Sequence, residues 1–220
     1  MIVPVHFKER SKTEPSSGTY YIVARNGLFL RKKMDWVDAV VPVEKIDVLD
    51  DEAVGVKLLL PPLPALVTAK ALKFAKAIFD KWQSEVGFLL HHGEEGYQLT
   101  VPKQSVDAAS IEYSADTRVP DMVCVGTVHS HGRFRAYHSG TDHQDEEDSD
   151  GVHITLGSIN KYPKFTLSAE VVVNGHRFPV ETTWFEGLIE RNGLWEIADP
   201  TLLEPELPGE WGSQVLLRAP

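Results

Sequence analysis

The sequence predicts an α/β domain built around a mixed β-sheet, preceded by a β-rich N-terminal extension. Two observations predict this fold. Short, apolar, β-branched runs alternate along the chain with segments of helical periodicity, which is typical of a sheet flanked by helices. Before Pro61, by contrast, the chain shows strand and turn signals only.

The elements can be placed in order from their local patterns. In the extension, residues 20–24 and 28–30 flank Asn26-Gly27, a strong hairpin signal. Further strands are expected at 36–43 and 54–60. Pro64 then opens an amphipathic helix that ends near Trp82, in which lysines recur at near-helical spacing between apolar residues.

Beyond this helix the chain alternates between strands and turns. Strands are expected directly after Glu85 and at 97–101, 122–128, 152–156, 165–173 and 177–180, the last two joined by an Asn174-Gly175 turn. We therefore divide the chain into an extension (1–62), a central domain (63–190) and a proline-containing tail (191–220) that is expected to lie over the surface.

Composition excludes several classes of function. The formal net charge is −10, which argues against a nucleic-acid partner because phosphate binding needs a basic surface. No segment is long and apolar enough for a signal peptide or a membrane span. The single cysteine, Cys124, falls in the expected buried strand at 122–128 and fits a reducing cytoplasm. It also argues against zinc deaminases, which need two cysteine ligands.

The stretch that indicates chemistry is His129-Ser130-His131, at the end of that strand. Side chains alternate along a strand, so both imidazoles point the same way and Ser130 points oppositely. Ser139 and Asp142 follow with the spacing of a capping box, which predicts a helix start. A helix cap alone would explain that second pair. Together, two imidazoles and a carboxylate with an open fourth position have the composition of a catalytic zinc site.

This pattern (His-Ser-His, seven residues, Ser, two residues, Asp) resembles the JAMM motif of the JAB/MPN metalloprotease family. The resemblance covers roughly residues 64–190 and implies an MPN fold, which is similar to cytidine deaminase. It implies one Zn²⁺ per chain, held by His129, His131 and Asp142. One departure is Gly132, which stands where the family commonly has proline; glycine permits an abrupt exit from the strand.

The family also requires an upstream glutamate, and Glu85-Val86-Gly87-Phe88-Leu89-Leu90 is similar to its Glu-x-x-Gly-Leu-Leu segment. By resemblance Glu85 is the general base that activates the zinc-bound water. Read without the family, Glu85 is a solvated residue at an element end. Glu94 and Glu95 compete for the role but lie between glycines, which is typical of a turn.

The resemblance implies a zinc-dependent isopeptidase that cleaves after the C-terminal glycine of a ubiquitin-like protein. Zinc acidifies the attacking water, Glu85 transfers its proton to the leaving amine, and the Ser139 hydroxyl helps zinc to stabilise the oxyanion. The tail of the ubiquitin-like protein would add as a strand to the segment between Glu85 and His129. Substrate-binding residues are not identified.

Partners would be a ubiquitin-like protein or its conjugates, with activating or conjugating enzymes of the same prokaryotic pathway; neither nucleic acid nor membrane is expected. The enzymatic alternative is processing of sulfur-carrier proteins. A non-catalytic MPN scaffold subunit is the other alternative, and the intact ligand pattern argues against it. The N-terminal extension is expected to bind partners or to position substrate.

Other polar residues near the motif are interpreted as structural. His138 and His143 flank a ligand set that is already complete, and His91-His92 mark a strand end. The acidic residues that follow Asp142 are expected to form a solvated helix face, or alternatively to attract a basic peptide; they are Asp145, Glu146, Glu147, Asp148 and Asp150.

Overall fold

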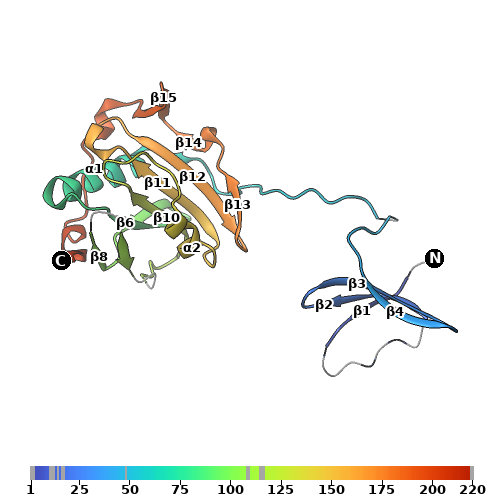
Figure 1. Cartoon of the computed structure of the whole chain (residues 1–220). Coiled ribbons are helices and arrows are strands. Elements are labelled where there is room, and N and C mark those ends of the chain that lie inside the picture. The colour runs from blue at the N-terminus through green and yellow to red at the C-terminus, as the bar shows by residue number, and fades with distance from the viewer. Residues whose placement is uncertain are drawn as a thin grey trace. The chain divides into compact units, whose positions relative to one another are not determined.

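The computed structural model describes residues 3–9, 13, 15, 18–47, 49–107, 110–113 and 117–218. The chain divides into two compact units, Met1–Val54 and Gly55–Pro220 (Figure 1). Each unit is described by itself. None of the helices in the described ranges combines the length and the apolar character needed to cross a membrane.

The first unit is a four-stranded sheet in the order β1-β2-β3-β4. Its strands are β1 (Val5–Phe7), β2 (Thr19–Ala24), β3 (Gly27–Met34) and β4 (Val37–Pro42). The predicted hairpin is confirmed: Ala24 pairs with Gly27, which has a φ of +130° that glycine tolerates. The strand expected at 36–43 is β4.

The strand expected at 54–60 does not form, because no other strand pairs with this segment. Leu58 and Leu60 pack against the apolar core of the second unit, whereas Leu59 between them is exposed. Val54 and Val56 are exposed as well, so only the end of this segment contributes to the core, and it does so without a β-ladder.

The second unit contains a mixed six-stranded sheet in the order β13-β12-β11-β10-β6-β7, in which only β10 and β11 run parallel. Its strands are β6 (Gly87–Gly93), β7 (Gly96–Thr100), β10 (Met122–Ser130), β11 (Gly151–Gly157), β12 (Thr166–Val173) and β13 (His176–Pro179). This confirms an α/β domain with a mixed sheet, although it is richer in strands than expected.

Smaller elements complete the unit. The remaining strands are β5 (Leu63–Pro64), β8 (Gln104–Val106), β9 (Ile111–Tyr113), β14 (Phe185–Glu186), β15 (Leu188–Arg191), β16 (Leu194–Ile197) and β17 (Val215–Leu217). The helices are α1 (Ala65–Trp82), α2 (Gly140–Glu146) and four 3-10 helices at Ile159–Lys161, Thr182–Trp184, Pro200–Leu203 and Trp211–Gln214. Strand β8 is central in a small sheet of order β17-β8-β9.

Helix α1 forms where the lysine-separated apolar pattern predicts it. Its apolar face enters one core with Phe88 of β6, Val128 of β10 and Ile154 of β11. The side chains opposite these, among them Thr127 and His129, therefore point to the other face of the sheet. The helix is capped by Gln83, whose left-handed φ of 57° turns the chain toward β6, and Glu85 lies two residues before that strand begins.

The tail expected to lie over the surface contributes to the core instead. Trp211 is only 3% exposed, and its ring packs edge-on against Phe74 of α1 and Phe88 of β6. Strand β17 adds to β8 in parallel. The prolines of this segment therefore do not prevent burial of the Trp211 ring.

Cys124 is exposed, so the expectation that it is buried was wrong. The outer half of β10 runs at the surface, where Val123 is 69% exposed, and the register with β6 shifts between Cys124 and Gly126. Only beyond this bulge does β10 enter the core. Gly126 marks the transition: a Cβ there would lie 1.8 Å from the Val152 carbonyl oxygen, so no other residue fits so close an approach of β11.

Candidate metal centre

The carboxyl end of β10 carries the two histidines. His129 pairs with Thr155 of parallel β11 and with Gly87 of antiparallel β6, which fixes its position within the sheet. His131 is the first residue after β10, which ends at Ser130, and its Nε2 lies 3.0 Å from the Nε2 of His129. The two rings therefore project from the same face, as the alternation of a strand predicts.

Helix α2 supplies the carboxylate. Ser139 is its N-cap: its Oγ accepts the Asp142 N–H at 3.2 Å, and the Asp142 carboxylate accepts the Ser139 N–H at 2.6 Å. The predicted capping box is thus confirmed. It turns the Asp142 side chain back toward the sheet, where its oxygens lie 3.4 Å from His129 Nε2 and 3.5 Å from His131 Nε2.

These three side chains fit a metal ion. Within the described residues, His129, His131 and Asp142 are the group of potential ligands whose donor atoms all lie within 4.8 Å of one another. A tetrahedral zinc centre with bonds of about 2.0 to 2.1 Å has ligand atoms about 3.3 Å apart, close to the separations above. Two imidazole nitrogens that face each other and a carboxylate also have the donor chemistry zinc prefers.

The protonation states of His129 and Asp142 suit metal binding, whereas a proton on His131 would have to leave when a metal binds. Burial lowers the pKa of His129 to about 4, so this ring is neutral near pH 7. Burial also acts to lower the pKa of His131, but its hydrogen bond to Asp142 and the charge of Glu85 outweigh it and raise that pKa. Burial would raise the pKa of Asp142, yet the interactions with His131, His129 and Ser139 hold it well below its usual range. The carboxylate is therefore ionised.

Glu85 faces the same pocket, as its alignment with β10 requires. Continuing the antiparallel register in which His129 pairs with Gly87 brings Glu85 opposite His131. The intervening pair confirms this register, because Ser130 N–H donates to the Val86 carbonyl at 3.0 Å and Val86 N–H donates to Ser130 Oγ at 3.1 Å. Residues directly opposite each other on paired strands point to the same face of the sheet, so Glu85 and His131 share a face.

The environment of Glu85 changes its acidity. The residue is 8% exposed, and burial raises the pKa of its carboxyl to about 7, although His131 acts to lower it. The charges of Asp142 and Asp107 raise it further. A carboxyl group that titrates near neutrality can both accept and donate a proton at physiological pH.

The pocket around these residues has aromatic and acidic walls. Strand β9 contributes Ile111 and Tyr113, and the loop after His131 contributes Phe134 and Tyr137. Asp145 of α2 lies on a further wall. Gly87 leaves room for Tyr113, because a Cβ on Gly87 would lie 3.3 Å from the tyrosine ring.

Gly132 gives the chain its exit from β10. Its φ of +48° lies in the left-handed region, which proline cannot adopt, so the family's usual proline would not fit this conformation. The loop is nevertheless fixed by backbone bonds: Phe134 N–H donates to the His131 carbonyl, and Ile159 N–H donates to the Gly132 carbonyl. His131 is therefore positioned without proline.

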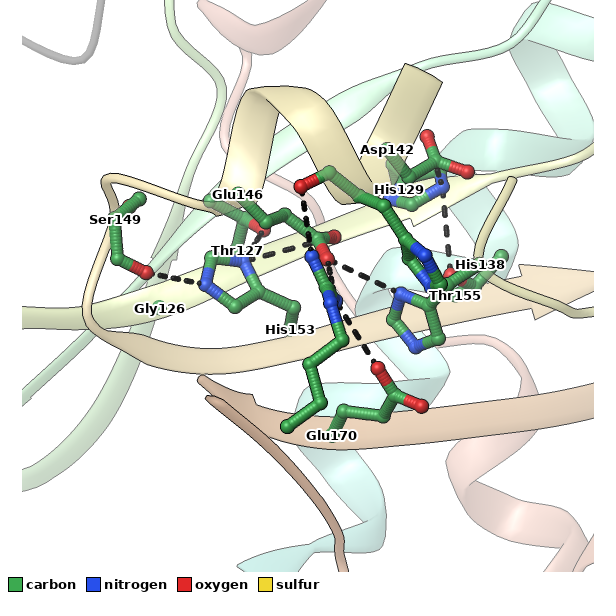
Figure 2. Close-up of polar contacts among 12 residues, drawn as sticks. Gly126, Thr127, His129, His138, Asp142, Glu146, Ser149, His153, Thr155 and Glu170 are labelled. Atoms are coloured by element: carbon green, nitrogen blue, oxygen red, sulfur yellow. Dashed lines mark hydrogen bonds and ion pairs between the residues drawn. The ribbon is translucent and has the colours of Figure 1, made fainter. Parts of the chain in front are cut away.

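One part of the site was not expected from the sequence. Glu146 was expected on a solvated face or to attract a basic peptide, but it is buried. It contacts Arg177, and Figure 2 shows its contacts with His138 and His153. Burial would raise its pKa, and these partners lower it. A usable signal was its position four residues after Asp142, which places both on one face of α2.

The histidines and glutamates that the sequence analysis interpreted as structural lie outside the group of potential ligands. His138 and His143 are not among the three converging donors. His91 Nε2 bonds to Thr100 Oγ1 at 3.0 Å, and the His92 ring packs edge-on against Tyr97. Glu94 and Glu95 lie in the exposed turn between β6 and β7.

Fold and site together define an α/β protein in which a His-His-Asp group has the arrangement to hold a metal ion, with a buried glutamate beside it. Residues 72–169, a little under half of the chain, match the family model described as prokaryotic homologs of the JAB domain. This confirms the resemblance to the JAB/MPN family for the segment that contains Glu85, His129, His131, Ser139 and Asp142. No curated protein matches the chain.

Proposed function

We propose that the chain is a zinc-dependent isopeptidase that cleaves after the C-terminal glycine of a ubiquitin-like protein, and that its central domain has the MPN fold. The observation that supports this most is the convergence of His129, His131 and Asp142 beside the buried Glu85 in one pocket. The match to prokaryotic homologs of the JAB domain supports a hydrolytic role.

His129, His131 and Asp142 would hold the ion. Zn²⁺ at such a centre supplies Lewis-acid chemistry, because it acidifies water and polarises a carbonyl group. Glu85, with its pKa near neutrality, takes a proton from the attacking water and later delivers it to the departing amine. Ser139 Oγ accepts from Asp142 N–H, so its own hydrogen stays available to donate to a developing oxyanion.

Strand β9 is the proposed docking edge for the substrate. It is the outer strand of the β17-β8-β9 sheet, and Ile111 and Tyr113 line the pocket. An extended C-terminal tail that pairs with this edge would lead its last residue toward the metal ligands. Gln104 holds the edge in place, because its amide both donates to and accepts from the backbone of Gly87.

The test is incubation of the purified protein with candidate ubiquitin-like proteins, fused through their C-terminal glycine to a reporter by a peptide or an isopeptide bond. We expect cleavage after the glycine, loss of cleavage with a chelator, and recovery with Zn²⁺. Cleavage of linear fusions alone would favour precursor processing, including that of sulfur carriers. Zinc binding without cleavage of any fusion would support the scaffold alternative and contradict the proposal.

A further inference from the structure

Helix α2 connects the metal centre to a second buried polar group. At its first turn Ser139 and Asp142 face the histidines, and at its last turn Glu146 points inward and is only 6% exposed. A helix of seven residues has little stability of its own, so contacts at its ends determine where it lies. The capping box fixes the first end. The second end depends on Glu146.

Arg177, on β13, makes a shorter contact with this second end than His138 or His153 does. Its guanidinium donates to the Glu146 carboxylate at 2.7 Å and to the carbonyl of His143 at 2.9 Å. It also donates to Glu170 of β12 at 3.0 Å, so the same guanidinium binds the sheet. Figure 2 labels both carboxylates, Glu146 and Glu170. One side chain therefore joins α2 to two strands that carry no residue of the metal centre.

Loss of these contacts would destabilise the C-terminal end of α2. The last carbonyl groups of a helix have no partner within the helix, and Arg177 satisfies one of them. A buried carboxylate that loses its cation is strongly destabilised. Without Arg177, Glu146 would move toward water, and α2 would have to shift with it.

We propose that Arg177 is a positioning residue of the metal centre: through Glu146 and His143 it fixes α2 and thereby the place of Asp142. The inference rests on the proposed metal centre and adds a residue that lies 35 positions from its nearest ligand along the chain. In the described part of the chain, the hydrogen bonds of Arg177 go to Glu146, Glu170 and the His143 carbonyl; of these only Glu146 lines the pocket, and none is a metal ligand.

The direction in which Zn²⁺ affinity changes when Arg177 is removed separates a positioning role from a purely electrostatic or purely stabilising one. Arg177 is a cation, so its removal by charge alone would strengthen the binding of another cation. If Arg177 only stabilised the fold, its removal would leave the Zn²⁺ affinity of the folded protein unchanged. A positioning role predicts weaker binding, because Asp142 would no longer be held in place for its share of the coordination.

The experiment is a Zn²⁺ titration of the full chain in competition with a chromophoric chelator, with the visible spectrum of the Co²⁺ form as a second readout. We expect Arg177→Leu to weaken Zn²⁺ binding about 10- to 100-fold, as loss of an outer partner of a ligand typically does. The Co²⁺ spectrum should change with it. Glu170→Gln is the matched control: it removes an Arg177 ion pair but no contact to α2, and should bind Zn²⁺ as the wild type does.

Unchanged or tighter Zn²⁺ binding by folded Arg177→Leu would overturn the inference. If that variant does not fold, Arg177→Lys decides, because a single ammonium cannot replace the fork that contacts Glu146 and His143 together. We expect a loss of about threefold or more for Arg177→Lys; wild-type affinity would overturn the inference. A wild-type chain that binds no Zn²⁺ would overturn the metal centre as well. Failure to cleave ubiquitin-like fusions has no bearing on this readout.

Discussion

Ser130 and Val86 exchange two hydrogen bonds, one to the backbone carbonyl at 3.0 Å and one to the serine hydroxyl at 3.1 Å. The residue between the two histidines thus binds the residue that follows Glu85. Its side chain points away from the metal ligands, and this is why it can hold the neighbouring strand. The His-Ser-His sequence therefore aligns Glu85 with the centre as well as presenting two imidazoles.

The first prediction concerns this bond. In Ser130→Ala the buried Val86 N–H loses its acceptor, so the free energy of unfolding should fall by about 1 to 3 kcal/mol. Urea unfolding of the metal-free protein measures the loss. Ser213→Ala, which removes an exposed hydroxyl bonded to the Glu210 carbonyl, is the control and should change stability little. Equal stability of the two variants would show that the bond does not hold the strand.

The second prediction is loss of metal in His131→Ala. Two ligands cannot complete the three-residue set of a catalytic zinc site, so zinc content should drop from one ion per chain to a small fraction. Circular dichroism should stay close to wild type, because the apolar core lies between the sheet and α1 and not at the centre. His92→Ala, outside the ligand group, should retain zinc. Full zinc content in His131→Ala would refute the assignment.

The third prediction concerns the first unit, Met1–Val54, which is separate from the unit that holds the site. A shortened chain of residues 55–220 should fold and bind zinc with wild-type affinity, since it retains Leu58 and Leu60, which pack on the core. We also expect it to cleave a small model amide but to act less well on a protein substrate, if the first unit binds partners. Loss of the model reaction would instead make that unit part of the chemistry.

The local patterns of the sequence predicted the parts of the site that short-range physics determines. The strand alternation of His129 and His131 and the capping of α2 by Ser139 depend only on neighbours in the chain. The exposure of Cys124 and the burial of Glu146 were missed for one common reason. Each depends on what covers it, and Arg177, which makes a buried Glu146 tolerable, lies far along the chain on β13.

The same distinction explains the two segments whose structure differs from expectation. Between Val54 and Leu60 the apolar residues suggested a strand, but a strand also needs a partner, and sequence alone could not show that none was adjacent. In the tail, the prolines suggested a segment that lies over the surface. They could not show that Trp211 would pack against the Phe74 and Phe88 rings.

The fourth prediction follows from the pKa of Glu85 in the metal-free protein. A folded-state pKa of about 7, raised from 4.5, means that ionisation of Glu85 opposes folding. The contribution of protonated Glu85 to the free energy of unfolding is therefore fully present below about pH 4.5. It is lost as the pH rises through 7, which lowers the free energy of unfolding by roughly 3 kcal/mol. Glu85→Gln should lack this loss and be more stable than wild type at pH 8. Glu94→Gln, in an exposed turn, is the control and should show the wild-type dependence of stability on pH. The same wild-type dependence in Glu85→Gln would contradict the prediction.

The last prediction tests Glu85 as the proton carrier. Glutamine has the size and shape of glutamate but cannot accept a proton, so Glu85→Gln should bind zinc normally, because Glu85 is not among the three converging ligands. Its rate of cleavage should fall by about a hundredfold or more, which is what general acid–base catalysis typically contributes. Single-turnover assays on a cleavable fusion, with zinc content measured on the same sample, separate the two effects. Glu94→Gln should cleave at the wild-type rate. Normal turnover by zinc-loaded Glu85→Gln would exclude Glu85 as the base, and a variant that lost its zinc would show that Glu85 helps to hold the ion.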